Sequence, residues 1–203
     1  RDPEMSRGLG DVYKRQEEIL PFTHLDKKRF GVISVGKQNA QPFVKRLQEY
    51  APIENISRLN TQSTDKEIKG IVDVISHSTQ TIIAIFSDKK EEIQLAEKIL
   101  KKATGKVLVF FTSPYSIPKY EELTAEAEAI IVAYENNPVM QECAAEVLFG
   151  GTSADGKLPV STGKYPQGSG IFIPECRLGH AFPEEVDMDL SLIHISEPTR
   201  HLR

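Results

Sequence analysis

The sequence has few of the features that define several large protein classes. Its 203 residues include no tryptophan, two cysteines and no long basic segment. The longest apolar runs span about six residues, far fewer than the ~20 that a membrane-spanning helix needs. The 25 lysines and arginines are outnumbered by 29 aspartates and glutamates, which gives a net charge of −4. We therefore expect no membrane span and no nucleic-acid partner, because nucleic acid requires a concentrated positive surface.

The two cysteines, Cys143 and Cys176, do not form a metal-binding pattern. They lack the CxxC spacing and the neighbouring pair of histidines that structural zinc sites use. We expect no metal and no cofactor. Cys143 falls on the apolar stripe of a predicted helix, where a cysteine usually packs as a small core residue. A disulfide between the two cysteines is an open alternative.

Short, nearly continuous apolar runs predict the strands of a buried parallel sheet. Such runs are rich in β-branched and aromatic residues when helices cover both faces of the sheet. Four clear runs and a weaker fifth lie at residues 30–35, 81–86, 106–111, 129–134 and 53–59. Residues 158–160, Leu-Pro-Val, predict one more strand at a sheet edge, where proline is tolerated.

Apolar residues at helical spacing lie between these strands. The segments are near residues 43–47, 68–75, 93–100, 118–127 and 137–148. In the fourth, Pro118 suits a first turn. The fifth is the clearest, because Asn137 can cap it, Pro138 suits its first position, and Gly150 and Gly151 can end it. The alternation predicts an α/β fold, a three-layer sandwich with a mainly parallel five- to six-stranded sheet and helices on both faces.

Residues 151–157, Gly-Thr-Ser-Ala-Asp-Gly-Lys, match most of the phosphate-binding pattern G-x-x-x-x-G-K-[ST]. Leu158 stands where the pattern needs a hydroxyl group. A phosphate-binding loop also leaves a strand and opens a helix, so that backbone N–H groups meet the phosphates. Here a predicted helix precedes the loop. We interpret the segment as a helix stop, a turn and a short strand, and we expect no nucleotide there.

The two ends of the sequence do not fit the pattern. Residues 1–16 and 191–203 lack apolar period and caps, and both resemble adapter-derived translations at the edges of metagenomic gene models. We expect both segments to be foreign or disordered and to contribute nothing to folding. Ordinary disordered termini are the alternative. Neither end shows a secretion signal. The predicted domain covers residues 17–175, and turn-forming residues lead into a linker at 176–190.

Residues 148–160, Leu-Phe-Gly-Gly-Thr-Ser-Ala-Asp-Gly-Lys-Leu-Pro-Val, resemble the C-terminal α/β-sandwich domain of glycoside hydrolase family 3. In that family a helix ends at Leu-Phe-Gly, and a turn leads to Gly-(Arg/Lys)-Leu-Pro-Val. Weaker agreement lies at Leu20-Pro21 with residues 25–32, at Pro114-Tyr115, and at residues 133–135 with Gln141. The resemblance covers about residues 17–190.

The linker narrows the resemblance to one branch of the family. Residues 177–179 and 183–189 resemble a linker that joins a β-N-acetylglucosaminidase-like unit to a serine β-lactamase-like domain, although Asp187 stands where glycine is more usual. The resemblance implies a parent enzyme that hydrolyses terminal β-N-acetylglucosaminides. It also implies two partners for this chain, a missing N-terminal (β/α)8 barrel and a downstream serine β-lactamase-like domain. The compartment is not determined, and an exported parent, in the periplasm or at the cell surface, is compatible with the resemblance.

The resemblance also implies that this chain carries no catalytic residue. Retaining glycosidases need a nucleophilic carboxylate and an acid/base group. In this family the nucleophile is an aspartate on the barrel. The glucosidase-like branch adds a glutamate from a long loop after the third strand, but here the loop is short and Glu91 and Glu92 fall in a helix's first turn. The short loop fits the N-acetylglucosaminidase branch, whose acid/base is a barrel histidine. We expect an accessory domain of a glycosidase that is inactive alone.

Five polar or aromatic residues follow predicted strands at the edge where α/β domains place ligands. We expect these residues to contact the barrel or its substrate, with loop packing and capping as the alternative: Ser113, Tyr115, Tyr134, Glu135 and Asn136.

A second reading of the whole chain is a free-standing flavodoxin-like or receiver-like binding module. A receiver needs acidic residues after its first strand and a lysine after its fifth. Residues 34–37 read Ser-Val-Gly-Lys and residues 133–135 read Ala-Tyr-Glu, so neither requirement is met. Fold alone does not exclude a binding module of another kind.

Overall fold

The computed structural model describes residues 12–14, 19–53 and 55–177. Its centre is a six-stranded sheet in the order β1-β6-β5-β4-β2-β3. Five strands are parallel, and β1 pairs antiparallel with β6. The five parallel strands have the order of flavodoxin-like folds. The strand bounds are Val12–Lys14 for β1, Phe30–Val35 for β2, Asn55–Leu59 for β3, Gln80–Ile85 for β4, Lys106–Phe110 for β5 and Ala129–Val132 for β6.

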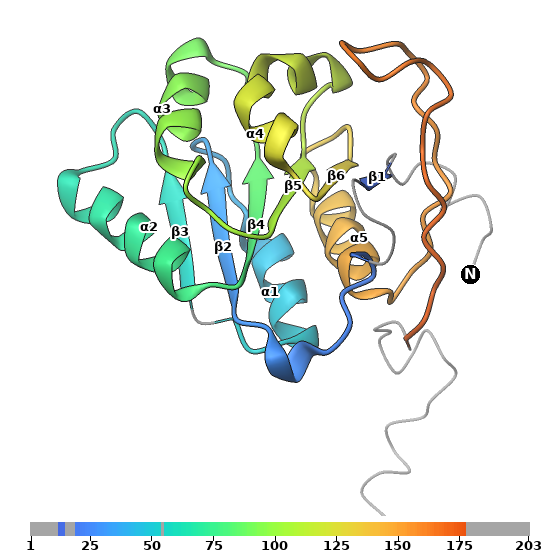
Figure 1. Ribbon diagram of the computed structural model, residues 1–203, viewed down its shortest axis with the longest axis horizontal. Coiled ribbons are helices and arrows are strands. Elements are labelled where there is room, and N and C mark those ends of the chain that lie inside the picture. Colours follow the sequence, from blue (N-terminus) through green and yellow to red (C-terminus); the bar gives the residue numbers. More distant parts are fainter. Residues whose placement is uncertain (1–11, 15–18, 54, 178–203) are drawn as a thin grey trace, which may run out of the picture.

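Helices cover both faces of this sheet (Figure 1). One face carries α1 (Gln41–Tyr50) and α5 (Pro138–Phe149), and the other carries α2 (Asp65–His77), α3 (Lys90–Leu100), the 3-10 helix η3 (Pro114–Tyr120) and α4 (Glu121–Glu126). Successive residues of β2, β4, β5 and β6 enter opposite cores, so Ile82 packs with Phe43 of α1 while Ile83 packs with Ile71 of α2. The predicted three-layer α/β sandwich is therefore confirmed.

Local capping explains where the helices begin and end. Thr64 accepts from Glu67 N and Glu67 reaches back to Thr64, which forms a capping box at the start of α2. The predicted cap of α5 is confirmed, because the Asn137 side chain accepts from Met140 N at 2.8 Å. Gly150 ends α5 with φ 74°, a left-handed conformation that favours glycine.

Three sequence expectations are corrected by the structure. Residues 158–160 form no strand; the antiparallel edge strand is β1, whose residues lie within the segment 1–16 that we expected to contribute nothing. Pro118 lies inside η3 rather than in the first turn of an α-helix. Neither cysteine is part of a disulfide, so the alternative of a disulfide between Cys143 and Cys176 is wrong. The tail at 191–203 and most of the predicted linker at 176–190 lie outside the described residues.

Residues 150–177, which we call the C-terminal arm, fold as one long, irregular hairpin along the side of the domain (Figure 1, orange to red). Ala154 and Ile173 exchange two backbone hydrogen bonds, as do Thr162 and Tyr165 at the tip. Leu158 N donates to Ser169 O between these pairs. Successive pairs are four residues apart along each strand of the hairpin, so the register is the same at every pair. At the base, Arg177 N donates to Gly150 O at 2.9 Å.

The arm is fixed to the domain at both ends. At the base, the guanidinium of Arg177 donates to Phe22 O at 2.8 Å. At the tip, the buried hydroxyl of Thr162 donates to Pro114 O at 2.9 Å. Three side chains of the arm itself, Ala154, Leu158 and Ile173, are buried, at 1%, 1% and 0% exposure. The arm therefore spans the distance between the two ends of the sheet.

Candidate functional site

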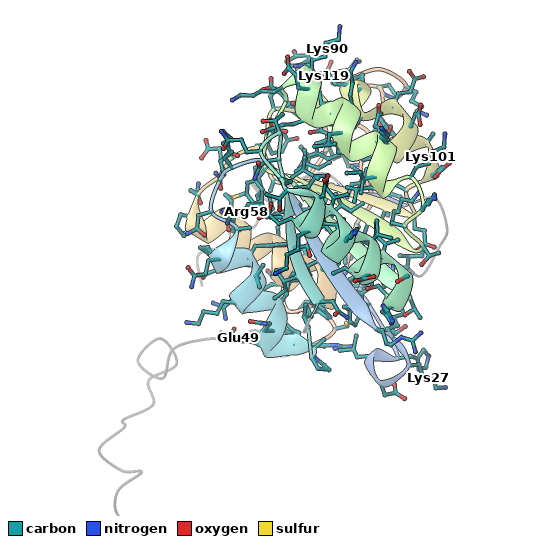
Figure 2. All side chains as sticks on the ribbon, turned by 90° about the vertical axis from the view of Figure 1, so that its left-hand side faces the viewer. Lys27, Glu49, Arg58, Lys90, Lys101 and Lys119 are labelled. Carbon is teal, nitrogen blue, oxygen red and sulfur yellow. The ribbon has the colours of Figure 1, made fainter. Side chains whose placement is uncertain are left out.

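The candidate residues lie in two turns at the C-terminal edge of the sheet. Figure 2 shows this edge at the top, where Lys90 and Lys119 lie, with Lys27 and Glu49 at the opposite end. The first turn joins β5 to η3. Its Ser113 is exposed and caps η3, because its hydroxyl accepts from Tyr115 N at 3.4 Å. The Tyr115 side chain is 60% exposed. This turn therefore presents a large aromatic surface to solvent.

The second turn joins β6 to α5. Tyr134 adopts a left-handed φ of 61° and packs, partly buried, against the core under α2, α3 and α4. Glu135 and Asn136 are exposed. The Glu135 carboxylate accepts from the Asn137 side-chain amide at 3.1 Å, and Asn136 Oδ1 accepts from Gln141 Nε2 at 2.6 Å. Hydrogen bonds to the N-cap and first turns of α5 thus fix this turn.

Gln141 connects this turn to a third loop. Its side chain is 3% exposed, and Nε2 also donates to Asn39 O at 2.9 Å. Its Oε1 accepts from Phe43 N at 3.2 Å. Phe43 N lies in the first turn of α1, whose N-cap residue Ala40 has no side-chain hydrogen bond. Gln141, a residue of α5, therefore supplies the acceptor for Phe43 N that the N-cap residue of α1 does not provide.

The turn between β4 and α3, residues 86–89, is short. Glu91 and Glu92 lie in the first turn of α3, as the sequence predicts, with Glu91 exposed and Glu92 only 3% exposed. Burial, and then the charge of Glu92, raises the pKa of Tyr120. The protonated Tyr120 hydroxyl donates to Ser87 O at 2.7 Å. This turn is therefore anchored to η3 rather than extended into solvent.

The five candidate residues come from two adjacent turns. Ser113 and Tyr115 come from one turn and Tyr134, Glu135 and Asn136 from the next, and these turns follow the neighbouring strands β5 and β6. Within the described ranges, no three His, Cys, Asp or Glu side chains gather as a metal site would require. Among the described helices, none combines the length and apolar character needed to cross a membrane.

Sequence reasoning missed two features near this edge. It did not assign the bridging role of Gln141, whose partners are distant in the sequence. It also treated residues 162–165 as part of a tail, whereas they line a half-open cavity of about 260 Å³ against η3 and α4. The only sequence signal for the second feature is Gly163, which has φ 55° in the two-residue turn at the arm's tip.

Several solved structures share this fold, although no protein-family model and no curated protein matches the sequence. A fungal multi-domain family 3 β-N-acetylglucosaminidase with a GCN5-related glucosamine N-acetyltransferase region has a TM-score of 0.63 at 16% identity, and the match covers 80% of this chain and 19% of that one. A family 3 β-N-acetylglucosaminidase from Paenibacillus sp. FPU-7 has a TM-score of 0.54 at 17% identity, covering 70% and 28%. A β-glucosidase from Listeria innocua has a TM-score of 0.55 at 11% identity, covering 73% and 24%.

The chain thus spans between 19% and 28% of the length of these three proteins. Identities this low establish the fold rather than the activity. The predicted resemblance is confirmed at that level: this chain has the α/β-sandwich fold found in the C-terminal regions of glycoside hydrolase family 3 enzymes.

Proposed function

We propose that this chain is the non-catalytic C-terminal α/β domain of a glycoside hydrolase family 3 enzyme. The observation that carries the proposal is the likeness in fold to parts of larger family 3 enzymes, over 70% to 80% of this chain. A domain of this kind stabilises its parent by burying a shared surface against a second domain. The partner is an N-terminal (β/α)8 barrel, which carries the nucleophile. A downstream serine β-lactamase-like domain is a second proposed neighbour.

We propose terminal β-N-acetylglucosaminides as the substrates of the parent. The support is the turn after β4, which spans only residues 86–89 and leads directly into α3. Neither Glu91 nor Glu92 extends from a long loop, so neither is placed to reach a sugar on another domain. The acid/base group would then come from the barrel. Two of the similar structures named above are β-N-acetylglucosaminidases, which agrees with this substrate class.

The proposed barrel-facing surface consists of Ser113, Tyr115, Tyr134, Glu135 and Asn136. It lies at the edge of the sheet where α/β domains place their ligands. Exposed aromatic side chains such as Tyr115 are typical anchors of protein interfaces. The hydrogen bonds of Gln141 and Thr162 fix both turns before binding, and this pre-organisation lowers the entropic cost of association.

A free-standing flavodoxin-like or receiver-like module is the second candidate. The strand order fits this candidate as well as it fits the first. A receiver needs acidic side chains grouped at this edge. The exposed Asp88 instead pairs with Lys119 at 3.1 Å. The length of the native transcript separates the two candidates, since only the first requires a barrel encoded upstream.

The activity test uses the purified chain at high concentration with chromogenic aryl β-N-acetylglucosaminides and β-glucosides. We expect no turnover above that of a mock purification. Glu91→Gln and Glu135→Gln are the informative variants, because each removes one exposed carboxylate near the edge. Turnover that either variant abolishes would place chemistry on this chain and contradict the proposal.

A further inference from the structure

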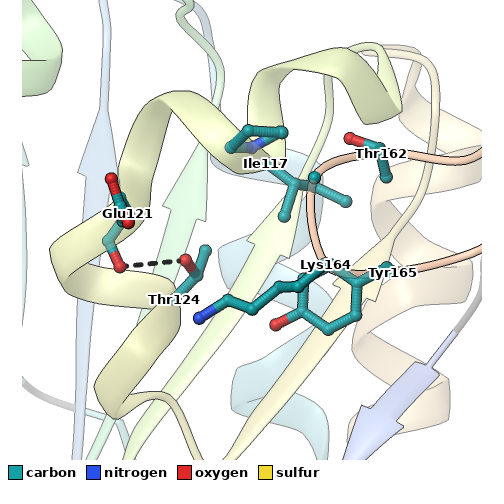
Figure 3. A pocket seen from close by; sticks show the side chains of 8 residues that line it. Ile117, Glu121, Thr124, Thr162, Lys164 and Tyr165 are labelled. Carbon is teal, nitrogen blue, oxygen red and sulfur yellow. Dashed lines mark hydrogen bonds between the residues drawn. The ribbon is translucent and has the colours of Figure 1, made fainter.

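The tip of the C-terminal arm forms one wall of the cavity of about 260 Å³, with η3 and α4 opposite, and the cavity is partly open to solvent. Figure 3 shows Lys164 and Tyr165 on the arm facing Thr124 on α4, with Ile117 above them. The tip is held in place by the hydrogen bond from Thr162 to Pro114 O. The cavity is therefore built from two segments of the chain, the continuous run of η3 and α4 and the tip of the arm.

The lining combines an apolar floor with one charge of each sign. Ile117 and Pro118 supply the floor, and Tyr165 forms a half-buried aromatic wall. Lys164 and Glu121 are the charged lining residues, and they form no ion pair with each other. Neither side chain has an ion pair or a hydrogen bond to another described residue.

This combination excludes simple ions as the best ligand. A plain anion attracted by Lys164 meets the carboxylate of Glu121, and a plain cation attracted by Glu121 meets the ammonium of Lys164. A molecule that carries both charges satisfies both side chains at once. An apolar group on the same molecule would cover Ile117 and Pro118. The volume is below that of typical pockets for drug-sized ligands, so the ligand is small.

We propose that this cavity binds a zwitterionic α-amino acid with an apolar side chain. Its carboxylate accepts from the Lys164 ammonium, and its ammonium donates to the Glu121 carboxylate. The Thr124 hydroxyl, which donates to Glu121 O at 3.1 Å, keeps lone pairs that can accept from the same ammonium. The side chain lies on Ile117 and Pro118 beside the Tyr165 ring. The inference is independent of the proposed glycosidase role.

The test is a nuclear magnetic resonance titration of the full ¹⁵N-labelled chain with L-leucine. We expect saturable shifts of the backbone amides of Thr124, Gly163 and Tyr165, with an affinity in the millimolar range. N-acetyl-L-leucine lacks the ammonium and L-leucinamide lacks the carboxylate. Each should bind about tenfold more weakly, as expected when one charge-assisted hydrogen bond is lost.

Variants locate the site without removing buried groups. Lys164→Met and Glu121→Gln should each weaken L-leucine binding about tenfold. Lys157→Met on the arm and Glu122→Gln on α4 remove neighbouring charges that do not line the cavity and should leave the affinity unchanged. Absence of saturable shifts, equal binding of N-acetyl-L-leucine, or unchanged affinity in Lys164→Met would overturn the proposal. Saturation by D-glucose with no response to L-leucine would also overturn it.

Discussion

At the scale of single residues, the candidate surface depends on a few buried polar side chains. Gln141→Leu keeps the volume of the side chain but removes its bonds to Asn39 O, Asn136 and Phe43 N. We expect a loss of about 2 kcal/mol in the free energy of unfolding, because the buried Phe43 N–H is left without its acceptor. Urea denaturation measures this change.

Gln94→Leu is the matched control for that substitution. Gln94 is an exposed residue of α3, so its replacement should change stability by less than about 0.5 kcal/mol. Equal urea midpoints for the Gln94 and Gln141 variants would show that the bridge from α5 to α1 contributes nothing.

The capping box of α2 predicts that the stability of the fold depends on pH. Hydrogen bonds from Thr64 lower the pKa of Glu67. Because the folded pKa lies below the unfolded value of about 4.3, this contribution is present above that value and is lost as pH falls through the folded pKa. Glu67→Gln should therefore show a smaller loss of stability than the parent chain between about pH 6 and pH 3. Urea midpoints across this range measure it.

Glu91→Gln serves as the comparison, because Glu91 lies in the first turn of α3 without a capping side chain. A pH profile of Glu67→Gln that matches the parent chain, with Glu91→Gln changed instead, would contradict the assigned role of the capping box.

The role of a single residue could be predicted from the sequence where its contacts are local. Asn137, Pro138 and Gly150 mark the ends of α5 through contacts within a few residues, so the sequence shows them directly. Gln141 differs, because its partners Phe43 and Asn39 lie 98 and 102 residues away. No local pattern reports such a contact. Likewise, the five candidate residues could be placed at one edge by strand order, but not their hydrogen bonds.

At the scale of elements, apolar runs located β2, β4, β5 and β6 well because both faces of these strands are buried, whereas β3 is exposed on one face and gave a weaker signal. β2 begins and ends where predicted. The predicted strand at 158–160 is wrong for a physical reason: Pro159 has no N–H, and Leu158 pairs with Gly168 and Ser169 of the arm instead. The arm itself escaped prediction because its pairs recur every four residues, without the period of two that marks regular strands.

The arm should contribute to stability through Ile173. This side chain of the arm is fully buried in the core of the domain, so Ile173→Ala should lower the free energy of unfolding by about 2–4 kcal/mol through lost burial and a residual cavity. Ile171→Ala, at a 38% exposed position of the same segment, should cost much less. Urea denaturation compares the two, and equal losses would mean that the arm does not pack as described.

At the scale of the whole molecule, the proposed surface predicts association with the barrel. When the chain is added to its separately produced cognate barrel at 100 times the dissociation constant, the barrel should gain about 2.7 kcal/mol of stability by linkage. Tyr115→Ala should weaken the association at least about tenfold, as expected for a central aromatic anchor. Differential scanning calorimetry and titration calorimetry measure the two effects.

Phe172→Ala tests whether the weaker barrel binding expected of Tyr115→Ala is specific to the proposed barrel-facing surface. Phe172 is 61% exposed, nearly the same as Tyr115, but lies on the C-terminal arm. Its replacement should leave the barrel affinity unchanged. If Phe172→Ala weakens binding and Tyr115→Ala does not, the contact surface has been assigned to the wrong side of the domain.

The hydrogen bond from Arg177 to Phe22 O has a consequence for modularity. It joins the segment that leads into β2 to the last described residues at one point, at the end of the sheet opposite the candidate surface. A cassette of residues 19–177 is anchored in this way near both of its ends, so it can be grafted into a surface loop of an unrelated host protein without stretching either junction. Two fluorophores attached at the junctions would stay close while the cassette is folded and separate when the base of the arm opens.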